Sequence, residues 1–350
     1  MTAVRAVVVE RFGTPDVLVP AELPDPVPGP GEVRVRVQAV AVARTKDVAT
    51  RAGKPPFAPA VTFPHVFGTE HAGVVDARGP GVPTDLLGRR VAVSAVLGCG
   101  ECRACRTARE EACPQLRLVG VHRQGSYAEF CVVPAANVHP IPDDLDVAEA
   151  AALAANGPVA RAQLDAGGVG PGSTVLVIGA GGALGSAAAA LAAFRGADVI
   201  GLEQLATKPG SLDGLPLHAG LDGDRPDLAD ALLELTGDWG IDCVIDNLGF
   251  AGLWERYWPA LADMGRIVVS GAIGGEPIPV RLAPLYLHSQ SLLGVRTGNR
   301  AQTAALWEDV RAGFRLPPSL VTVLHLEQVA AAHTLIEEGG NRGQVVVTVG

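Results

Sequence analysis

Apolar and polar residues alternate strictly at the start of residues 32–42, EVRVRVQAVAV. Alternation with a period of two is typical of a β-strand with one buried face. Two further apolar runs, residues 90–96 (RVAVSAV) and 127–134 (YAEFCVVP), are predicted strands as well. Clusters of proline and glycine, such as PDPVPGPGE and RGPGVP, separate these runs and indicate turns. The first third of the chain is therefore predicted to be rich in β-structure.

The pattern changes near residue 146, where predicted strands and helices begin to alternate. A helix is expected from Asp146, whose side chain suits an N-cap and which has Glu149 three residues on. Predicted strands follow at residues 174–179, 197–202, 242–246, 266–271 and 292–296, and predicted helices at 183–194 and 227–235. Alternation of this kind indicates a parallel sheet. The tail returns to a mixed pattern, with a helix at residues 302–312 and a last strand at 344–349.

Residues 173–194, STVLVIGAGGALGSAAAALAAF, carry no charge and are long enough for a membrane-spanning helix, with Gly181 and Gly185 in a Gly-x3-Gly spacing. A buried strand, a glycine turn and a buried alanine-rich helix would give the same composition. We favour this second interpretation because four glycines interrupt the run and its β-branched residues gather at its start. No other span is a candidate, and the first residues, MTAVRAVVVERFG, lack a cleavage site. The chain is therefore expected in the cytoplasm.

Composition narrows the function classes. The 350 residues are 48% hydrophobic, enough for two ordinary domains with a sizeable core. Twenty-eight basic and 37 acidic residues give a net charge of −9. A negative chain without a basic run is a poor candidate for binding nucleic acid or an anionic membrane. The predicted partner is a small-molecule substrate.

A glycine-rich turn follows the predicted strand at residues 174–179 and opens the next helix. The sequence VLVIGAGGALGSA places Gly179, Gly181, Gly182 and Gly185 in the context that a dinucleotide fingerprint requires. Glycines let the backbone approach a pyrophosphate, and the helix N-terminus offers free N–H groups to it. Glu203 ends the following strand, where an acidic side chain can bind the ribose hydroxyls of NAD and would repel the 2′-phosphate of NADP. NAD(H) is favoured, but Lys208 nearby leaves NADP(H) open.

Four of the six cysteines lie within fifteen residues, in the pattern C-x2-C-x2-C-x7-C formed by Cys99, Cys102, Cys105 and Cys113. Four thiolates make a closed tetrahedral set, which is typical of one structural zinc ion. Disulfides are the first alternative, and a cytoplasmic location disfavours them. An iron–sulfur cluster is the second, and its usual cysteine run has a shorter final gap. Cys131 and Cys243 lie in apolar strands and are predicted to be buried.

With these motifs in place, the chain resembles the medium-chain dehydrogenase/reductase superfamily, which includes zinc alcohol dehydrogenases and quinone reductases. The resemblance covers essentially the whole length. It is carried by the cysteine cluster, the glycine turn, GTEHAGVV at 68–75, GSYAEFCVVP at 125–134, VIDNLG at 244–249 and GVRTGNR at 294–300.

The resemblance implies an α/β fold with a GroES-like β-barrel catalytic domain at residues 1–152, which carries a zinc lobe at 95–115. A Rossmann domain, a doubly wound parallel sheet, is expected at 153–296, and residues 297–350 are expected to rejoin the first domain. Nicotinamide would lie between the domains. A homodimer or homotetramer would form by pairing edge strands such as SLLGVR. The implied cofactor-binding residues are Gly179, Gly181, Gly182, Ala183, Leu184, Glu203, Asn247, Gly271 and Arg296.

The chain departs from the family at the catalytic metal. Zinc-dependent members hold a second zinc ion through three ligands, and on this alignment Arg44, Thr69 and Ala154 stand at those positions. Of that site only Glu70 survives. His65 and His71 lie nearby, but they are not expected to rebuild a three-ligand set. The sequence therefore predicts a structural zinc ion only.

Lys46 is the predicted proton donor or oxyanion partner, with Arg44 beside it. Thr69 is a candidate hydrogen-bond donor to substrate or nicotinamide. Glu70 is expected to form an ion pair under the site, with Arg44 or Arg300. A purely structural lysine, paired with an acid at the surface, remains an alternative for Lys46.

Without a catalytic metal, reduction of an activated C=C bond needs less assistance than alcohol oxidation. The predicted function is an NAD(P)H-dependent reductase acting on an activated double bond or a carbonyl. One alternative is an alcohol dehydrogenase or ketoreductase that uses Lys46 as acid and base. Another is a non-catalytic, nucleotide-binding protein on a dehydrogenase scaffold.

Overall fold

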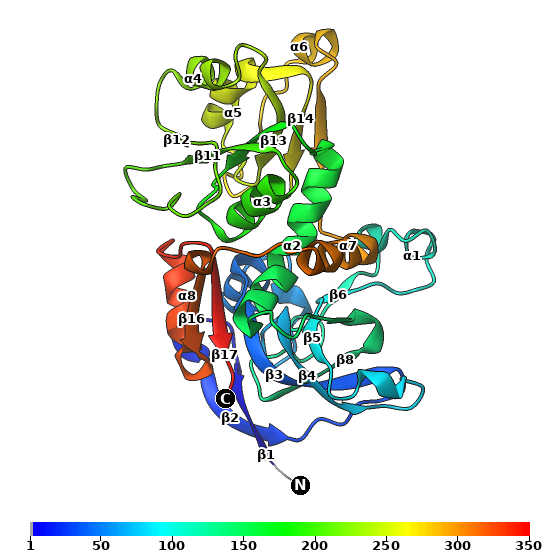
Figure 1. Cartoon of the computed structure of the whole chain (residues 1–350). Coiled ribbons are helices and arrows are strands. Elements are labelled where there is room, and N and C mark those ends of the chain that lie inside the picture. The colour runs from blue at the N-terminus through cyan, green and yellow to red at the C-terminus, as the bar shows by residue number, and fades with distance from the viewer. Residues whose placement is uncertain (1–2) are drawn as a thin grey trace. The chain divides into compact units, whose positions relative to one another are not determined.

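The computed structural model describes residues 3–350 and divides the chain into two compact units, which are coloured along the chain in Figure 1. The first unit comprises Met1–Ala155, Asn299–Gly313 and Val321–Gly350. The second unit comprises Asn156–Gly298 and Phe314–Leu320. The boundary at residue 155 falls inside helix α2 (Val147–Gly167). Asp146 caps this helix, since its Oδ1 accepts from the N–H groups of Ala148 and Glu149 at 2.9 and 3.0 Å.

The first unit is built on one seven-stranded sheet in the order β16-β17-β3-β4-β5-β9, with β8 also paired to β3. All pairs are antiparallel except β16 with β17. The strands are β3 (Glu32–Val42), β4 (His71–Arg78), β5 (Arg90–Val93), β8 (Phe130–Pro134), β9 (Val138–Pro140), β16 (Val321–His325) and β17 (Gln344–Thr348). Two small sheets join β1 (Ala3–Val8) with β2 (Val19–Pro24) and β6 (Val96–Leu97) with β7 (Arg117–Leu118).

The strand predicted over residues 90–96 is wrong in its extent, because it breaks into β5 and β6. The side-chain amide of Asn137 donates to the carbonyl oxygens of Ser94 and Val96 at 2.8 and 2.7 Å. The N–H of Ser94 in turn donates to the carbonyl of Asn137. These bonds replace strand pairing at the break.

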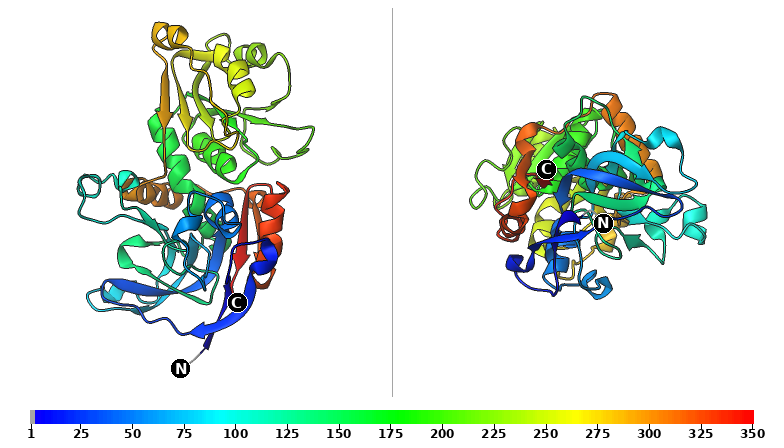
Figure 2. Two further views of the ribbon diagram at one scale, coloured as in Figure 1. Left: turned by 180° about the vertical axis from the view of Figure 1, so that it is seen from behind. Right: turned by 90° about the horizontal axis from the view of Figure 1, so that it is seen from below.

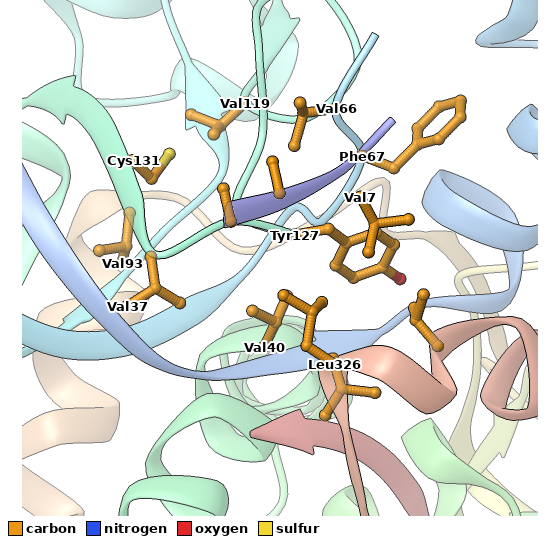
Figure 3. Close-up of a cluster of buried hydrophobic side chains, with 14 of the residues drawn as sticks. Val7, Val37, Val40, Val66, Phe67, Val93, Val119, Tyr127, Cys131 and Leu326 are labelled. Atoms are coloured by element: carbon orange, nitrogen blue, oxygen red, sulfur yellow. The ribbon is translucent and has the colours of Figure 1, made fainter. Parts of the chain in front are cut away.

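The C-terminal segment of the chain completes the sheet of the first unit. Strand β17 pairs with β3, with Val345 opposite Val42, and Figure 2 shows this last strand from behind, lying against the N-terminal part of the chain. Helices α7 (Arg300–Arg311) and α8 (Val329–Glu337) belong to the same unit. Alternate residues of β3, Val33, Val35 and Val37, are buried in one core, and Val40 joins it after the register shift that follows Val37. Figure 3 shows Val37 and Val40 in this core with Tyr127 and Leu326. Burial of this apolar face explains the period of two in the sequence.

The second unit holds a six-stranded parallel sheet in the order β12-β11-β10-β13-β14-β15. The strands are β10 (Thr174–Ile178), β11 (Asp198–Glu203), β12 (Ala219–Asp222), β13 (Ile241–Asp246), β14 (Leu261–Val269) and β15 (Ser291–Gly294). The helices are α3 (Ala183–Phe194), α4 (Leu228–Leu235), α5 (Ala251–Tyr257) and α6 (Leu282–Leu287). This strand order is that of the doubly wound Rossmann fold, in which the direction of winding reverses between β10 and β13. Ligands of such sheets bind beyond the carboxyl ends of the strands at that point.

The uncharged residues 173–194 fold as a strand, a turn and a helix, as predicted. Strand β10 and the alanine-rich face of α3 are buried, and the glycine turn joins them. Cys131 and Cys243 are buried in strands, also as predicted. Within residues 3–350, no helix combines the length and the apolar character that crossing a membrane requires.

Candidate functional site

Directly after β3, residues Arg44–Ala49 form a short π-helical turn that the carboxylate of Asp47 fixes in place. Its Oδ2 accepts from the N–H of Ala43 at 2.8 Å, and its Oδ1 accepts from the N–H of Gly68 at 3.1 Å. Asp47 is fully buried, and burial raises its pKa to about 7 despite these two bonds. Asp47 thereby ties the turn to the segment that leads into β4.

Lys46 projects from this turn and forms an ion pair with Glu70. The Lys46 side chain keeps 22% of its surface exposed, whereas Glu70 keeps 5%. The other oxygen of Glu70, Oε2, accepts from the hydroxyl of Thr69 at 2.6 Å. Among the described residues the ammonium donates one hydrogen bond, to Glu70, which leaves two of its three N–H donors free. The result is a partly exposed donor held by a buried carboxylate.

Arg44 does not join this ion pair. Its guanidinium donates to the carbonyl oxygen of Ile336 on α8, and burial lowers its pKa below the usual value. Arg300 lies elsewhere in the first unit, with its Nε 3.9 Å from Glu110. The expectation that Glu70 pairs with Arg44 or Arg300 was therefore wrong, because Lys46 is the cation that reaches it.

None of the residues at the three expected positions of a catalytic zinc ion carries a metal-binding side chain. Arg44 bonds to α8, Thr69 donates to Glu70, and Ala154 is a buried alanine. His65 and His71 are buried, and their ring nitrogens face the carbonyl oxygens of Gly120 and Thr69. Burial lowers the pKa of His71 to about 4, so it is neutral.

The cysteine cluster brings its four sulfur atoms together. The sulfurs of Cys99, Cys102, Cys105 and Cys113 all lie within 4.8 Å of one another, and those of Cys99 and Cys105 are 3.9 Å apart. A tetrahedron with Zn–S bonds of about 2.3 Å has sulfurs about 3.8 Å apart, so the set fits one zinc ion. Backbone N–H groups of Cys102 and Cys105 donate to the sulfurs of Cys99 and Cys102, each at 3.4 Å. The N–H of Cys102 is the chief cause that lowers the pKa of Cys99 to about 7, which favours the thiolate.

No other group of at least three His, Cys, Asp or Glu side chains is placed to hold a metal ion in the part of the chain that the structure describes. The cysteine set is closed, with all four protein ligands present, as in structural zinc sites. It lies on a loop with the short helix α1 (Arg103–Arg106), whose N-cap is Cys102.

The glycine turn has the close contacts that only glycine allows. A Cβ at Gly185 would lie 2.1 Å from the carbonyl oxygen of Gly179. Gly179 itself has a positive φ of 69°. The N-cap of helix α3 is Gly182, which has no side chain to cap the helix, so its first N–H groups stay available. Ala183 and Leu184 lie in its first turn. This is the geometry that binds a pyrophosphate.

Glu203 stands at the carboxyl end of β11, as the sequence suggested. Its Oε1 accepts from the N–H of Gln204 and lies 3.5 Å from the ammonium of Lys208. Its Oε2 is buried and has no hydrogen-bond partner among the described residues. That oxygen lies beside Gly181, 3.2 Å from where a Cβ of that residue would be. A ribose hydroxyl would satisfy it, so the residues present fit the adenosine half of a dinucleotide.

The remaining predicted cofactor residues lie beyond β13, β14 and β15. Asn247 follows β13, Gly271 follows Ser270 after β14, and Arg296 is an exposed residue after β15. A Cβ at Gly271 would lie 2.8 Å from the carbonyl oxygen of Asn247, so glycine is needed for the strand ends to approach. These positions are at the edge of the sheet where a ligand of this fold binds.

Comparison with known proteins identifies the fold's relatives. Residues 29–143 match the family model described as the alcohol dehydrogenase GroES-like domain, and residues 183–312 match the zinc-binding dehydrogenase model. The NAD-dependent alcohol dehydrogenase of Sulfolobus acidocaldarius is 31% identical over 294 residues, which cover 82% of this chain and 83% of that protein. The chain belongs to the medium-chain dehydrogenase/reductase superfamily.

Solved structures of this superfamily superpose over nearly the whole chain. A crystal structure of an NAD-dependent alcohol dehydrogenase aligns with a TM-score of 0.89 at 36% identity and covers 99% of this chain and 100% of its own. The crotonyl-CoA carboxylase/reductase AntE in complex with NADP aligns with a TM-score of 0.86 at 25% identity and covers 99% and 94%. The predicted GroES-like and Rossmann folds are confirmed, and the protein is an oxidoreductase of the medium-chain type.

Within this dehydrogenase/reductase, the structure adds residues that the sequence patterns did not single out. Asp47 is one, since its role depends on the N–H groups of two segments. The pair formed by the buried Arg51 and Glu337 is another, and it joins the turn region to α8. A third is Gln163, which bonds to Asn247 from α2 at 2.8 Å. The sequence offered no specific signal for Gln163, because α2 carries other polar residues such as Asn156 and Arg161.

Proposed function

We propose that this oxidoreductase uses NAD(H) to reduce an activated C=C bond or a carbonyl of a small molecule, without a catalytic zinc ion. The observation that supports the proposal is the Lys46–Glu70 ion pair, whose residues lie within two positions of Arg44 and Thr69. In the alignment with the zinc-dependent members, positions 44 and 69 are two of the three metal-ligand positions. Arg44, Thr69 and Ala154 offer no ligand set there. A protein cation is thus the electrophilic group that the site supplies.

The residues that fit the adenosine half of a dinucleotide support NAD(H) as the cofactor. Glu203 offers a buried, unpartnered oxygen to a ribose hydroxyl, and a carboxylate there would repel a 2′-phosphate. The pyrophosphate would be held by the glycine turn and the first N–H groups of α3. The named function of the Sulfolobus relative agrees with this choice. Bound nicotinamide would supply the hydride of the reduction.

Lys46 acts at the substrate oxygen on which negative charge builds during reduction. Its free N–H donors stabilise that charge, and the ammonium then gives a proton to the product. Glu70 holds the ammonium in position, and the hydroxyl of Thr69 orients Glu70 through its second oxygen. The exposed part of Lys46 allows a proton to return from water.

A second candidate reaction is oxidation and reduction of an alcohol/ketone pair, with Lys46 as acid and base. The alcohol dehydrogenases among the relatives favour it. Reduction of an activated C=C bond is supported by a similar protein as well, the crotonyl-CoA carboxylase/reductase.

A substrate screen separates these reactions. The purified protein, with NADH and separately with NADPH, is offered a panel of enones, quinones and ketones, and loss of absorbance at the cofactor band is followed. Faster turnover of enones or quinones than of simple ketones is the expected result. Faster turnover of simple ketones favours the second reaction. Binding of NADH with no turnover of any acceptor would instead favour the nucleotide-binding alternative.

The proposed assembly is a homodimer that pairs the edge strands of the Rossmann sheets. Strand β15 is the last strand in the sheet order, so one of its edges has no strand partner in the described chain. Nearby apolar side chains are exposed, including Leu282, Tyr286 and Leu287 on α6 and Leu292 on β15. Exposed apolar surface beside an open edge favours association. The expected cytoplasmic location stays a prediction.

A further inference from the structure

Three unpartnered polar atoms gather at one place in the second unit. They are Oε1 of Gln163, Nδ2 of Asn247 and Oγ of Ser270, and all three are buried without a hydrogen-bond partner in the described chain. Gln163 comes from α2, Asn247 follows β13 and Ser270 follows β14. Buried polar atoms are nearly always paired, so three unpaired ones on residues that are hydrogen-bonded to one another require an explanation.

The three residues meet at a single oxygen. Oδ1 of Asn247 accepts from Nε2 of Gln163 at 2.8 Å and from the N–H of Ser270 at 3.2 Å. These two bonds fix both amide planes, so the free end of each amide is also fixed. Gln163 then presents an acceptor and Asn247 a donor, beside a hydroxyl that serves as either.

Their place in the sheet indicates which half of the cofactor they face. The glycine turn follows β10, and Glu203 is the last residue of β11, which pairs with β10 on the side away from β13. A dinucleotide crosses the winding reversal at its pyrophosphate, so its second half lies beyond β13 and β14. Asn247 and Ser270 are half-buried residues at those two strand ends, and the cluster therefore lies just beneath the surface there.

We propose that Gln163, Asn247 and Ser270 bind the carboxamide of the cofactor's nicotinamide. A primary carboxamide offers two N–H donors and one carbonyl acceptor, which match the acceptor of Gln163, the donor of Asn247 and the hydroxyl of Ser270. Because all three atoms are buried, binding of the carboxamide requires rotation of the serine hydroxyl and a shift of the two amide side chains. The inference rests on the proposed use of NAD(H), and it assigns to side chains the orientation of the nicotinamide ring.

The test measures binding of NADH and of ADP-ribose, which lacks the nicotinamide, by titration of the full-length protein. The Gln163→Leu variant keeps the size of the side chain and removes its polar atoms. We expect its Kd for NADH to rise about tenfold, because one or two hydrogen bonds to the carboxamide are lost. Its Kd for ADP-ribose should stay unchanged within about twofold. Ser270→Ala is the second variant, and its Kd for NADH should also rise. Because Ser270 is only half-buried, this variant is available if Gln163→Leu fails to fold. Glu234→Gln, on the exposed face of α4, is the control and changes neither.

The outcomes are distinct. Unchanged NADH binding in both variants would overturn the inference and assign the cluster to a purely structural bond between α2 and β13. An equal loss for NADH and ADP-ribose would also overturn it, because the effect would not come from the nicotinamide. If the unaltered protein binds neither ligand, the proposed function itself fails. A further readout is 3-acetylpyridine adenine dinucleotide, which lacks the amide N–H groups: Gln163→Leu should weaken its binding less than that of NAD.

Discussion

The ammonium of Lys46 and the carboxylate of Glu70 form an ion pair in which the acid is buried and the lysine is partly exposed. The residues are 24 positions apart, and the turn that Asp47 fixes brings them together. The pair gives the site a cation whose remaining N–H donors are free. The account of catalysis depends on this relationship.

Replacing Lys46 by Met should lower kcat roughly 100-fold or more, because proton donation of this kind contributes about 10²–10⁴-fold. The Kd for NADH should not change, since Lys46 lies in the first unit and the dinucleotide residues lie in the second. Steady-state kinetics and a binding titration measure the two quantities. The exposed Lys54 of the same unit, changed to Met, is the matched control. Full kcat in the Lys46→Met protein would remove the proposed donor.

Asp47 should make the stability of the fold depend on pH. Burial raises its pKa to about 7, whereas an unfolded chain releases this proton near pH 4. Between these values the folded state binds the extra proton, so the contribution of Asp47 to the free energy of unfolding falls as the pH rises through the window. At pH 8 the contribution of Asp47 to the free energy of unfolding is lower than at pH 4 by up to roughly 4 kcal/mol.

The Asp47→Asn variant has no such titration. The Tm of the variant minus the Tm of the unaltered protein should therefore rise from pH 5 to pH 8. Loss of the carboxylate as a hydrogen-bond acceptor shifts this difference by the same amount at both pH values. Differential scanning calorimetry at the two pH values gives the comparison, with exposed Asp85→Asn as the control. A Tm difference that does not vary with pH would show that Asp47 is ionised throughout.

Glu203 should determine the preference for NADH over NADPH. Changing it to Ala removes the acceptor for the ribose hydroxyls, and the Kd for NADH should rise about tenfold. The Kd for NADPH should fall or stay constant, because repulsion of the 2′-phosphate is lost while Lys208 remains. Fluorescence titration with each cofactor tests this. A parallel loss for both cofactors would argue against a ribose contact.

Strand β15 should carry the subunit contact. A lysine in place of the exposed Leu292 puts a charge into the proposed interface and should convert the dimer to a monomer. Light scattering after size-exclusion chromatography gives the mass. Val323→Lys, at a similarly exposed apolar residue of the first unit, should leave the mass unchanged. A dimer that persists with Leu292→Lys would place the contact elsewhere.

Local sequence patterns predicted most of the fold, because strand alternation and the glycine turn are properties of neighbouring residues. The break between β5 and β6 was missed, since it depends on Asn137, which is 43 positions from Ser94. Strand β12 and helix α8 were missed as well. Their sequences, AGLD and VAAAHTLIE, are short or only weakly patterned, and they gain stability from their neighbours in the fold.

The residues of the candidate site likewise divide into those that local sequence motifs indicated and those that depend on contacts between distant segments. Spacing alone indicated the four cysteines, the glycine turn and Glu203, because each is a motif within one short segment or one β-α-β unit. The partner of Glu70 was predicted wrongly, since Lys46, Arg44 and Arg300 are equivalent cations until the backbone is known. The bond between Gln163 and Asn247 spans 84 positions and leaves no trace in local periodicity.

The central claim is that this oxidoreductase carries a structural zinc ion and works without a catalytic one. The most direct test is the zinc content of the active protein, measured by mass spectrometry of the metal alongside kcat on the best acceptor from the screen. The account predicts one zinc ion per chain in fully active protein, and none in a Cys99→Ser variant, while Cys243→Ala keeps one. Two zinc ions per active chain, with kcat lost as the second is removed, would contradict it.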